Sequence, residues 1–256
     1  RVQVRGQRRR AAQRDAAVLL QALDEAGLAH DLGEQALEFY RQTGYRRQQI
    51  NLLLMLGRVE NKTGRFANAQ RMFESAATEA RVVGDGQSEG LAEQGLAAVL
   101  YRQGRLPEVL AHSAAATAAY RRAGRGGNAG YSLMYEGEML LQLGEIEKAN
   151  KVLDEAASSA AKNPRLVASV AAVRAQAALS RADYSEAARH LRSAEQSDDE
   201  SAPWRAQLDA IRAGLEPPER AATRCRDVQK MADDSSAFDI RTGVLLSCAD
   251  TLGKRG

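Results

Sequence analysis

The sequence has little cysteine, proline or aromatic residue, and these shortages exclude several classes of structure. Its two cysteines, Cys225 and Cys248, are too few for a disulfide framework or a metal-ligand cluster. We therefore expect both to be small core residues in a reduced, cytoplasmic protein. Aromatic residues make up 5% of the chain, which disfavours a sheet protein with a large aromatic core. The five prolines lie near the starts of expected helices, where proline is tolerated.

Long apolar runs and a strong charge imbalance are also missing. No stretch reaches the roughly 18 apolar residues that a membrane helix needs. The basic N-terminus is not followed directly by the apolar segment of a signal peptide. Basic residues number 36 and acidic residues 33, for a formal charge of +3, which is typical of a solvated helical surface. We expect no membrane association, and the near balance disfavours nucleic acid as a partner.

Motifs of nucleotide-phosphate binding and of zinc-protease chemistry do not occur either. The chain has no phosphate-binding P-loop and no His-Glu-x-x-His motif. The three histidines, His30, His112 and His190, fall in separate predicted helix pairs, so we expect them to be surface or packing residues rather than metal ligands. The sequence thus predicts no enzymatic activity, no metal and no cofactor.

What the sequence does contain is a repeated pattern of apolar and small residues. Between Leu52 and Asp85, apolar residues recur three and four apart on both sides of Gly64. This is the period of two amphipathic helices joined by a tight glycine turn. Matching turns follow at successive intervals of 40, 40 and 38 residues, at Gly104, Gly144 and Ala182.

Positions at constant distances from these turns carry small residues, which let two helices approach closely. Seven residues before the four turns stand Gly57, Ala97, Gly137 and Ala175. Five residues after them stand Ala69, Val109, Ala149 and Ala187, and twelve after stand Ala76, Ala116, Ala156 and Ala194. Nine residues after the turns stand Phe73, Ser113, Leu153 and Leu191. This arrangement resembles the tetratricopeptide repeat, which places small and aromatic residues at these relative positions.

The resemblance covers most of the chain and implies its fold. We expect an all-α, right-handed superhelical solenoid of antiparallel helix pairs, with about six repeats. The period exceeds the usual repeat of about 34 residues, so the extra residues either lengthen the helices or extend the loops between repeats. Longer repeats of this kind are similar to those in bacterial signalling ATPases, Ser/Thr kinases and transcriptional activators.

Three regions follow from this pattern. Residues 1–10, rich in arginine, are expected to be a basic linker or the start of the first helix. Residues 11–202 hold the repeats, and residues 203–256 hold a degenerate C-terminal repeat and a capping helix near 237–252. Trp204 is expected to pack at the junction to this last region. Because the chain begins with Arg1 rather than Met, we expect it to be part of a larger multidomain protein.

The family resemblance also implies a binding site. In tetratricopeptide arrays the first helices of the pairs line a concave groove, which is the usual ligand site. Asn can bond a peptide backbone in both directions, and Arg can hold a carboxylate with two parallel hydrogen bonds. The predicted groove residues are Asn51, Leu54, Arg58, Asn61, Gln94, Tyr101, Tyr131, Met134, Glu138 and Gln176.

These observations predict a non-catalytic module that recognises a protein or peptide, as a regulatory or scaffolding part of a bacterial, cytoplasmic signalling or transcription-regulating protein. The bacterial source is inferred only from the abundance of Arg and Ala. One alternative is a receptor for a small molecule or signalling peptide that acts as an inducer. A second alternative is a nucleic-acid-associated array that uses the basic N-terminal arm, for which affinity would fall steeply with salt.

Overall fold

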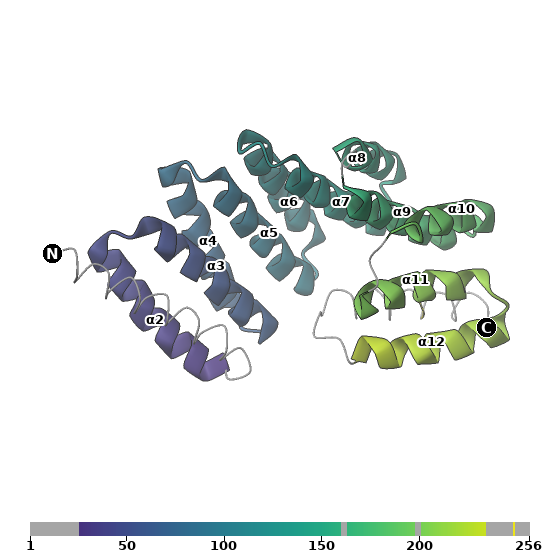
Figure 1. Ribbon diagram of the computed structural model, residues 1–256, viewed down its shortest axis with the longest axis horizontal. Helices are drawn as coiled ribbons and strands as arrows, with labels where there is room; N and C mark the ends of the chain where they lie inside the picture. Colours follow the sequence, from purple (N-terminus) through teal and green to yellow (C-terminus); the bar gives the residue numbers. More distant parts are fainter. Residues whose placement is uncertain (1–25, 160–162, 198–200, 234–247, 249–256) are drawn as a thin grey trace. The chain divides into compact units, whose positions relative to one another are not determined.

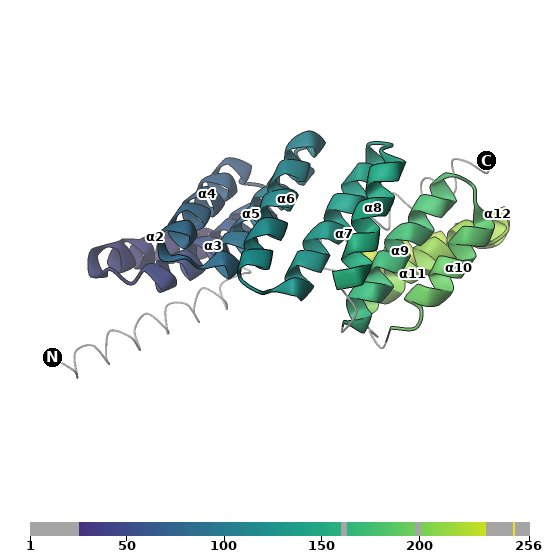
Figure 2. The same cartoon turned by 90° about the horizontal axis from the view of Figure 1, so that it is seen from above.

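The chain folds as a succession of α-helices, with no strand in the residues that the structure describes. The structure is a computed structural model that describes residues 26–159, 163–197, 201–233 and 248. Consecutive helices pair in antiparallel fashion, in the order of the sequence (Figure 1; Figure 2). The described helices are α2 (Ala26–Thr43), α3 (Arg46–Lys62), α4 (Phe66–Val83), α5 (Gly86–Arg102), α6 (Leu106–Arg122), α7 (Gly126–Gln142), α8 (Ile146–Ser159), α9 (Pro164–Ser180), α10 (Tyr184–Ala194), α11 (Ala202–Leu215) and α12 (Pro218–Asp233).

One turn geometry joins successive helices from α2 to α8, both within and between the pairs, and also joins α9 to α10. The amide after each turn residue donates to the carbonyl five residues earlier, as Arg65 does to Glu60 at 2.9 Å, which ends the helix in a Schellman motif. From α2 to α8 the turns between pairs are therefore as short as those within them, and the extra residues of the long repeat lie in helices of 17 and 18 residues. The turn glycines have positive φ and recur every 20 residues, at Gly44, Gly64, Gly84, Gly104, Gly124 and Gly144.

Ala182 takes the same backbone conformation without being a glycine. Its φ is 58°, which places its Cβ close to the following carbonyl oxygen. The next residue, Asp183, caps α10 by accepting a hydrogen bond from the amide of Glu186 at 2.9 Å. The turn predicted at Ala182 is thus confirmed, although the residue there is strained.

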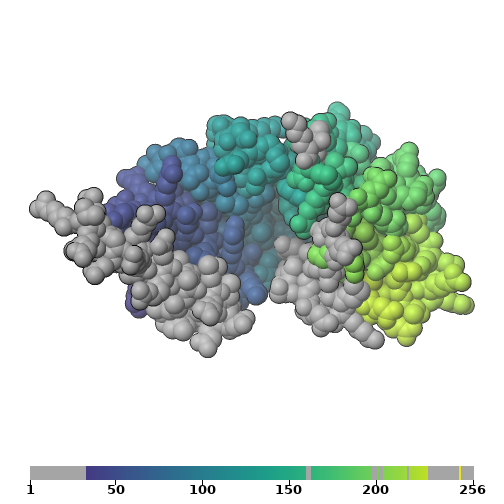
Figure 3. Space-filling model, in the orientation of Figure 1, coloured from purple at the N-terminus to yellow at the C-terminus, as the bar shows by residue number. Residues whose placement is uncertain are grey.

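The chain divides into two units, unit 1 (Arg1–Ser132) and unit 2 (Leu133–Gly256), with the division inside α7. In unit 1 the small residues of the repeat contact large side chains of the neighbouring helix. A Cβ added to Gly57 on α3 or Gly95 on α5 would lie 2.7 Å or 2.4 Å from the ring of Phe73 on α4. The ring therefore fills the space between two glycine positions. Within each unit, helices that follow one another in sequence also adjoin at the surface (Figure 3).

The α5–α6 pair also packs a large side chain against small residues, but at different positions. It carries Ala97 and Ser113 where the α3–α4 pair has Gly57 and Phe73, and both are buried. Its large side chain is instead Tyr120, near the end of α6, which is fully buried. The position of the large residue along the second helix can thus shift when a matching small residue shifts with it.

Unit 2 uses glycine–leucine contacts in the same way. A Cβ on Gly137 of α7 or Gly214 of α11 would lie 2.6 Å from Leu153 or Leu179 respectively. Trp204 on α11 is 9% exposed and belongs to a core cluster with residues of α9 and α10. The prediction that Trp204 packs at this junction is confirmed.

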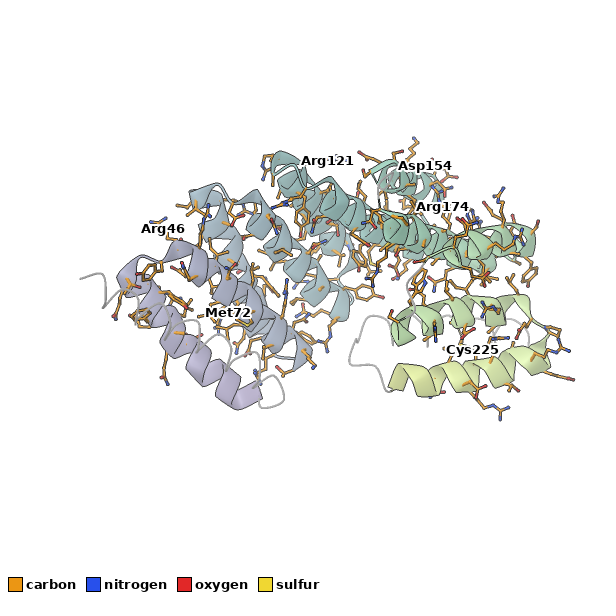
Figure 4. All side chains as sticks on the ribbon, in the orientation of Figure 1. Arg46, Met72, Arg121, Asp154, Arg174 and Cys225 are labelled. Carbon is orange, nitrogen blue, oxygen red and sulfur yellow. A yellow bond between two sulfur atoms is a disulfide. The ribbon has the colours of Figure 1, made fainter. Side chains whose placement is uncertain are left out.

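The two cysteines depart from the sequence-based expectation. Both are buried, in a cluster formed with α11 and α12, so their expected core position is confirmed. They are also joined by a disulfide, Cys225–Cys248, with a Cα–Cα distance of 5.7 Å; Figure 4 labels Cys225 on α12. The prediction of two reduced thiols is therefore wrong. The 23-residue separation of the two cysteines gave no sign of this pairing.

Other expectations fall partly outside the described residues. These are the basic segment at residues 1–10 and all of the predicted capping helix except Cys248. Within the described ranges, no helix is both long and apolar enough to cross a membrane.

Candidate functional site

A chain of hydrogen bonds links three consecutive helices of unit 1. The Tyr120 hydroxyl on α6 donates to Gln94 Oε1 on α5 at 2.7 Å. The Gln94 side-chain amide then donates to Ser132 Oγ on α7 at 3.0 Å. Gly90 makes room for the tyrosine, because a Cβ there would lie 2.6 Å from the ring. Tyr120, on the second helix of its pair, is thereby linked to polar groups on the first helices of two pairs, α5 and α7.

The pKa of the Tyr120 hydroxyl depends on its burial and on two further residues. Burial raises the pKa of Tyr120 to about 12. A hydrogen bond with Asn128 on α7 and the positive charge of Arg58 on α3 act in the opposite direction on this pKa. The phenol is consequently neutral at physiological pH and remains a hydrogen-bond donor. We call Tyr120, Gln94, Asn128 and Ser132 the polar network.

Two predicted groove residues on α3 remain open to solvent. Asn51 and Arg58 lie seven residues apart, two helical turns, and both are exposed. No ion pair joins Arg58 to any residue within the described ranges. Its guanidinium therefore has donors available for a carboxylate, and Asn51 has a donor and an acceptor available for a peptide backbone. We call the exposed side of α3, α5 and the first part of α7 the first-helix face.

The polar groups of Asn61, by contrast, already contact a neighbouring helix. Arg102 on α5 donates to the backbone carbonyl of Asn61 and lies 3.4 Å from its Oδ1. The same guanidinium sits 4.9 Å from the ring centroid of Phe66, a cation–π distance. Asn61 thus helps to hold α5 against α3, and it is half-buried.

Comparisons with known proteins place this architecture in a recognised fold. The structure of a Rap protein complexed with competence and sporulation factor matches with a TM-score of 0.58 at 13% identity, over 91% of this chain and 61% of that one. The structure of BtubC (BKLC) from P. vanneervenii matches with a TM-score of 0.59 at 17% identity, over 95% and 92% of the two chains.

The fold is a tetratricopeptide-like solenoid. The all-α array of antiparallel helix pairs predicted from the sequence is therefore confirmed. This chain spans about three fifths of the Rap protein's length, and at these identities the likeness concerns the fold alone. No family model and no curated protein matches the chain.

The ten predicted groove residues of this solenoid are divided between its two units. Asn51, Leu54, Arg58, Asn61, Gln94, Tyr101 and Tyr131 belong to unit 1, and Met134, Glu138 and Gln176 belong to unit 2. Tyr101 and Tyr131 are half-buried on α5 and α7, and Glu138 and Gln176 are half-buried on α7 and α9.

Leu54 and Met134 are not surface residues. They are only 5% and 6% exposed, so the expectation that both side chains line an open groove is wrong. Leu54 belongs to the main core cluster of unit 1. A helical period identifies the side of a helix only to within a broad stripe, and the helices packed beside it cover the edges of that stripe.

Sequence reasoning missed three members of the polar network, Tyr120, Asn128 and Ser132. Tyr120 lies on a second helix, so the rule that first helices supply the site excluded it. Gly90 was the available signal, since a glycine inside a helix costs about 1 kcal/mol relative to alanine and so suggests a close neighbour. The identity of that neighbour could not be read from the sequence.

Unit 1 also holds a charged cluster between α4, α5 and α6. Glu93 accepts from Arg81 and lies 2.7 Å from His112 Nδ1, while Glu89 accepts from Arg81 at 2.9 Å and from Arg122 at 2.7 Å. The two carboxylate side chains are 4% and 11% exposed. Because buried carboxylates require such partners, this cluster joins helices of two successive repeats and offers no unsatisfied charge to a ligand.

Proposed function

We propose that this chain is a non-catalytic recognition module that binds an extended peptide or protein segment on the first-helix face of unit 1. In this proposal Arg58 receives a carboxylate of the ligand, and Asn51 bonds its backbone. The polar network holds α5, α6 and α7 in register beneath the bound segment.

The observation that carries the proposal is the state of Arg58. It is exposed, has no ion-pair partner among the described residues, and lies near a network whose own hydrogen bonds are satisfied. A carboxylate bound there gains two charge-assisted hydrogen bonds without first breaking an internal pair. Arg81 and Arg122 differ from it, because each already binds a buried glutamate.

The comparisons support a protein or peptide as the ligand class. The matching Rap structure contains competence and sporulation factor, so a solenoid of this fold can hold such a factor. The mixed polar character of the face, with amides, tyrosines and the exposed Arg58, suits a peptide backbone and an acidic group.

We further propose that the module belongs to a larger bacterial signalling or transcription-regulating protein, as the long repeats suggest. Its cytoplasmic location stays a prediction. The support that this prediction drew from reduced cysteines is lost, because disulfides persist mainly in oxidising compartments.

The test is selection from a displayed library of random ten-residue peptides, followed by affinity measurements with the selected peptides by fluorescence anisotropy. We expect Arg58→Gln to weaken binding about tenfold or more, the effect of losing charge-assisted hydrogen bonds. Amidating the C-terminus or neutralising an acidic side chain of the peptide should produce the same loss, and should add nothing in the Arg58→Gln variant.

Arg71→Gln is the matched control, since Arg71 is an exposed arginine on the second helix α4. Its removal changes the net charge equally and should leave the affinity unchanged. Equal weakening by both substitutions would show a general charge effect and contradict the site. Binding of arbitrary nucleic acid, with affinity falling steeply between low and moderate salt, would favour the nucleic-acid alternative instead.

A further inference from the structure

A pocket of about 360 Å³ opens between α8, α9 and α10, wholly within unit 2. Its residues recur at helical spacing, so that one stripe of each helix faces the pocket. Ala177 lies between Arg174 and Arg181 on α9, and its short side chain leaves space between the two arginines. The pocket residues, which we call the arginine pocket, are Asn150, Asp154, Arg174, Ala177, Arg181, Glu186, Arg189 and His190.

Positive charge exceeds negative charge in this pocket. Three arginines face two carboxylates, Asp154 and Glu186. Asp154 pairs with Arg174, and the two side chains lie next to each other in Figure 4. Asp154 is on the outer edge, with its side chain 75% exposed, whereas the side chain of Arg174 is 24% exposed. The carboxylate is therefore well hydrated and can be displaced from the more enclosed guanidinium at little cost.

Glu186 is shared among three cationic or potentially cationic groups. Its Oε2 lies 3.1 Å from Arg181, while its Oε1 lies 3.4 Å from Arg189 and 3.5 Å from His190. Charge-assisted hydrogen bonds are normally about 2.7–2.9 Å long, so one carboxylate does not satisfy all three groups. The donors of this side of the pocket exceed the acceptor oxygens that the protein supplies.

The corresponding region of unit 1 shows the contrast. His112 on α6 and His190 on α10 both lie eight residues after their turn residues, Gly104 and Ala182. His112 is bound by the buried Glu93, which belongs to a cluster filled by its own carboxylates. Among the described residues, the ion-pair partner of His190 is Glu186, which is shared with two arginines. The same position of the repeat is thus next to buried carboxylates in unit 1, whereas in unit 2 it lines a pocket in which arginines outnumber carboxylates.

We propose that the arginine pocket binds the phosphate group of a small phosphorylated molecule. Three guanidiniums and an imidazole converge from two helices, and a phosphate monoester offers three terminal oxygens where a carboxylate offers two. Arginine binds such oxygens with two parallel hydrogen bonds. The volume accommodates a phosphate with a small attached group. This site is independent of the peptide site proposed on unit 1.

His190 provides an internal reporter of binding. Burial, together with the charges of Arg174 and Arg189, lowers the pKa of His190, and Glu186 opposes this effect. The other charged groups of the pocket are Asp154 on α8 and Arg181 at the end of α9. A dianion placed among these groups favours the imidazolium, so ligand binding should raise the pKa of His190.

The experiment titrates the full chain with inorganic phosphate and with glycerol 3-phosphate, using glycerol and acetate as comparisons, and follows the His190 ring by NMR. We expect saturable binding of both phosphates, an upward shift of the His190 pKa, and no response to glycerol. The double variant Arg174→Gln, Arg181→Gln should bind about tenfold or more weakly and lose the pKa shift. The single variant Arg189→Gln, at a 66% exposed side chain, tests the same pocket with little risk to folding.

Arg192→Gln, an exposed arginine of α10 outside the pocket, is the matched control and should bind as the unchanged protein does. Tighter binding of glycerol 3-phosphate than of inorganic phosphate identifies a phosphate ester as the ligand, and the reverse identifies the free anion. The proposal is overturned if binding does not saturate, if Arg192→Gln weakens it as much as the pocket variants do, or if acetate shifts His190 equally. Neither result depends on whether a peptide binds unit 1.

Discussion

Gly57 on α3 lies so close to Phe73 on α4 that a Cβ added to the glycine would meet the ring at 2.7 Å. We expect Gly57→Ala to lower the free energy of unfolding by about 1–2 kcal/mol, because the cost of overpacking exceeds the gain in helix propensity. Urea denaturation measures the change. The substitution should cost less in a Phe73→Leu background, since the smaller side chain relieves the contact.

Gly126→Ala is the control for this substitution. Gly126 begins α7, and a Cβ there would meet nothing within 4 Å. Without a clash, the alanine should leave stability unchanged or raise it slightly. Equal destabilisation by the two substitutions would refute the packing explanation.

The left-handed backbone conformation of Ala182 predicts that replacing it by glycine stabilises the protein. Because it occupies the left-handed region with φ of 58°, Ala182→Gly should raise the free energy of unfolding by about 1 kcal/mol, the relief of strain less the added chain entropy. The reverse change at an equivalent turn, Gly104→Ala, should lower it by a similar amount. A Cβ on Gly104 would meet nothing within 4 Å, so only backbone strain is tested. Thermal unfolding of both variants checks the opposite signs.

The ion pair between Glu60 and Arg65 predicts unequal stability costs for removing its two members. Glu60 is 0% exposed and accepts from Arg65 Nε at 2.6 Å and Nη2 at 2.9 Å, and from Asn68 at 3.1 Å. Arg65→Ala leaves a buried charge short of donors and should cost about 3 kcal/mol. Glu60→Leu leaves a guanidinium that water can reach, since the side chain of Arg65 is 40% exposed, and should cost clearly less. Chemical denaturation that ranks the two in the opposite order would disprove this account.

Tyr120 predicts a loss of stability in alkali. Its pKa is raised by burial to about 12 from an ordinary value of 10.0, so the folded state holds the phenolic proton more tightly than the unfolded state. Below about pH 10 both states are protonated, and the free energy of unfolding is unaffected. As the pH rises towards 12, the free energy of unfolding falls by about 2 kcal/mol. Urea unfolding across this range should fall more steeply for the unchanged protein than for Tyr120→Phe. Parallel curves would contradict the assignment.

The disulfide predicts a redox-dependent stability of the C-terminal helices. Cys225 and Cys248 are 23 residues apart, and reducing a crosslink of this span should destabilise by about 3 kcal/mol. Thermal unfolding of unit 2 with and without dithiothreitol measures the effect. A Cys225→Ala, Cys248→Ala variant should not respond to dithiothreitol, and the untreated protein should not react with a maleimide until it is unfolded and reduced.

The sequence by itself determined the helices, their turns and their pairing. These features depend on contacts between residues close in the chain: a turn residue ends one helix, and seven residues before it or nine after it the two helices of a pair meet. Gly57 and Phe73 are therefore recognisable as a motif from their spacing around Gly64. The tight turn at Ala182 is recognisable too, because the residues around it keep the spacing of the other copies.

Only the tertiary structure decided which side chains reach solvent and which distant residues meet. Leu54 and Met134 have the helical phase of surface residues, yet neighbouring helices bury them. Tyr120 reaches Gln94 because Gly90 leaves space for it, and Cys225 forms a disulfide with Cys248 across a separation of 23 residues. The arginine pocket likewise combines α8 with α9 and α10. Such contacts join residues whose separation in sequence has no constant period, so they become visible only when neighbouring repeats are packed together.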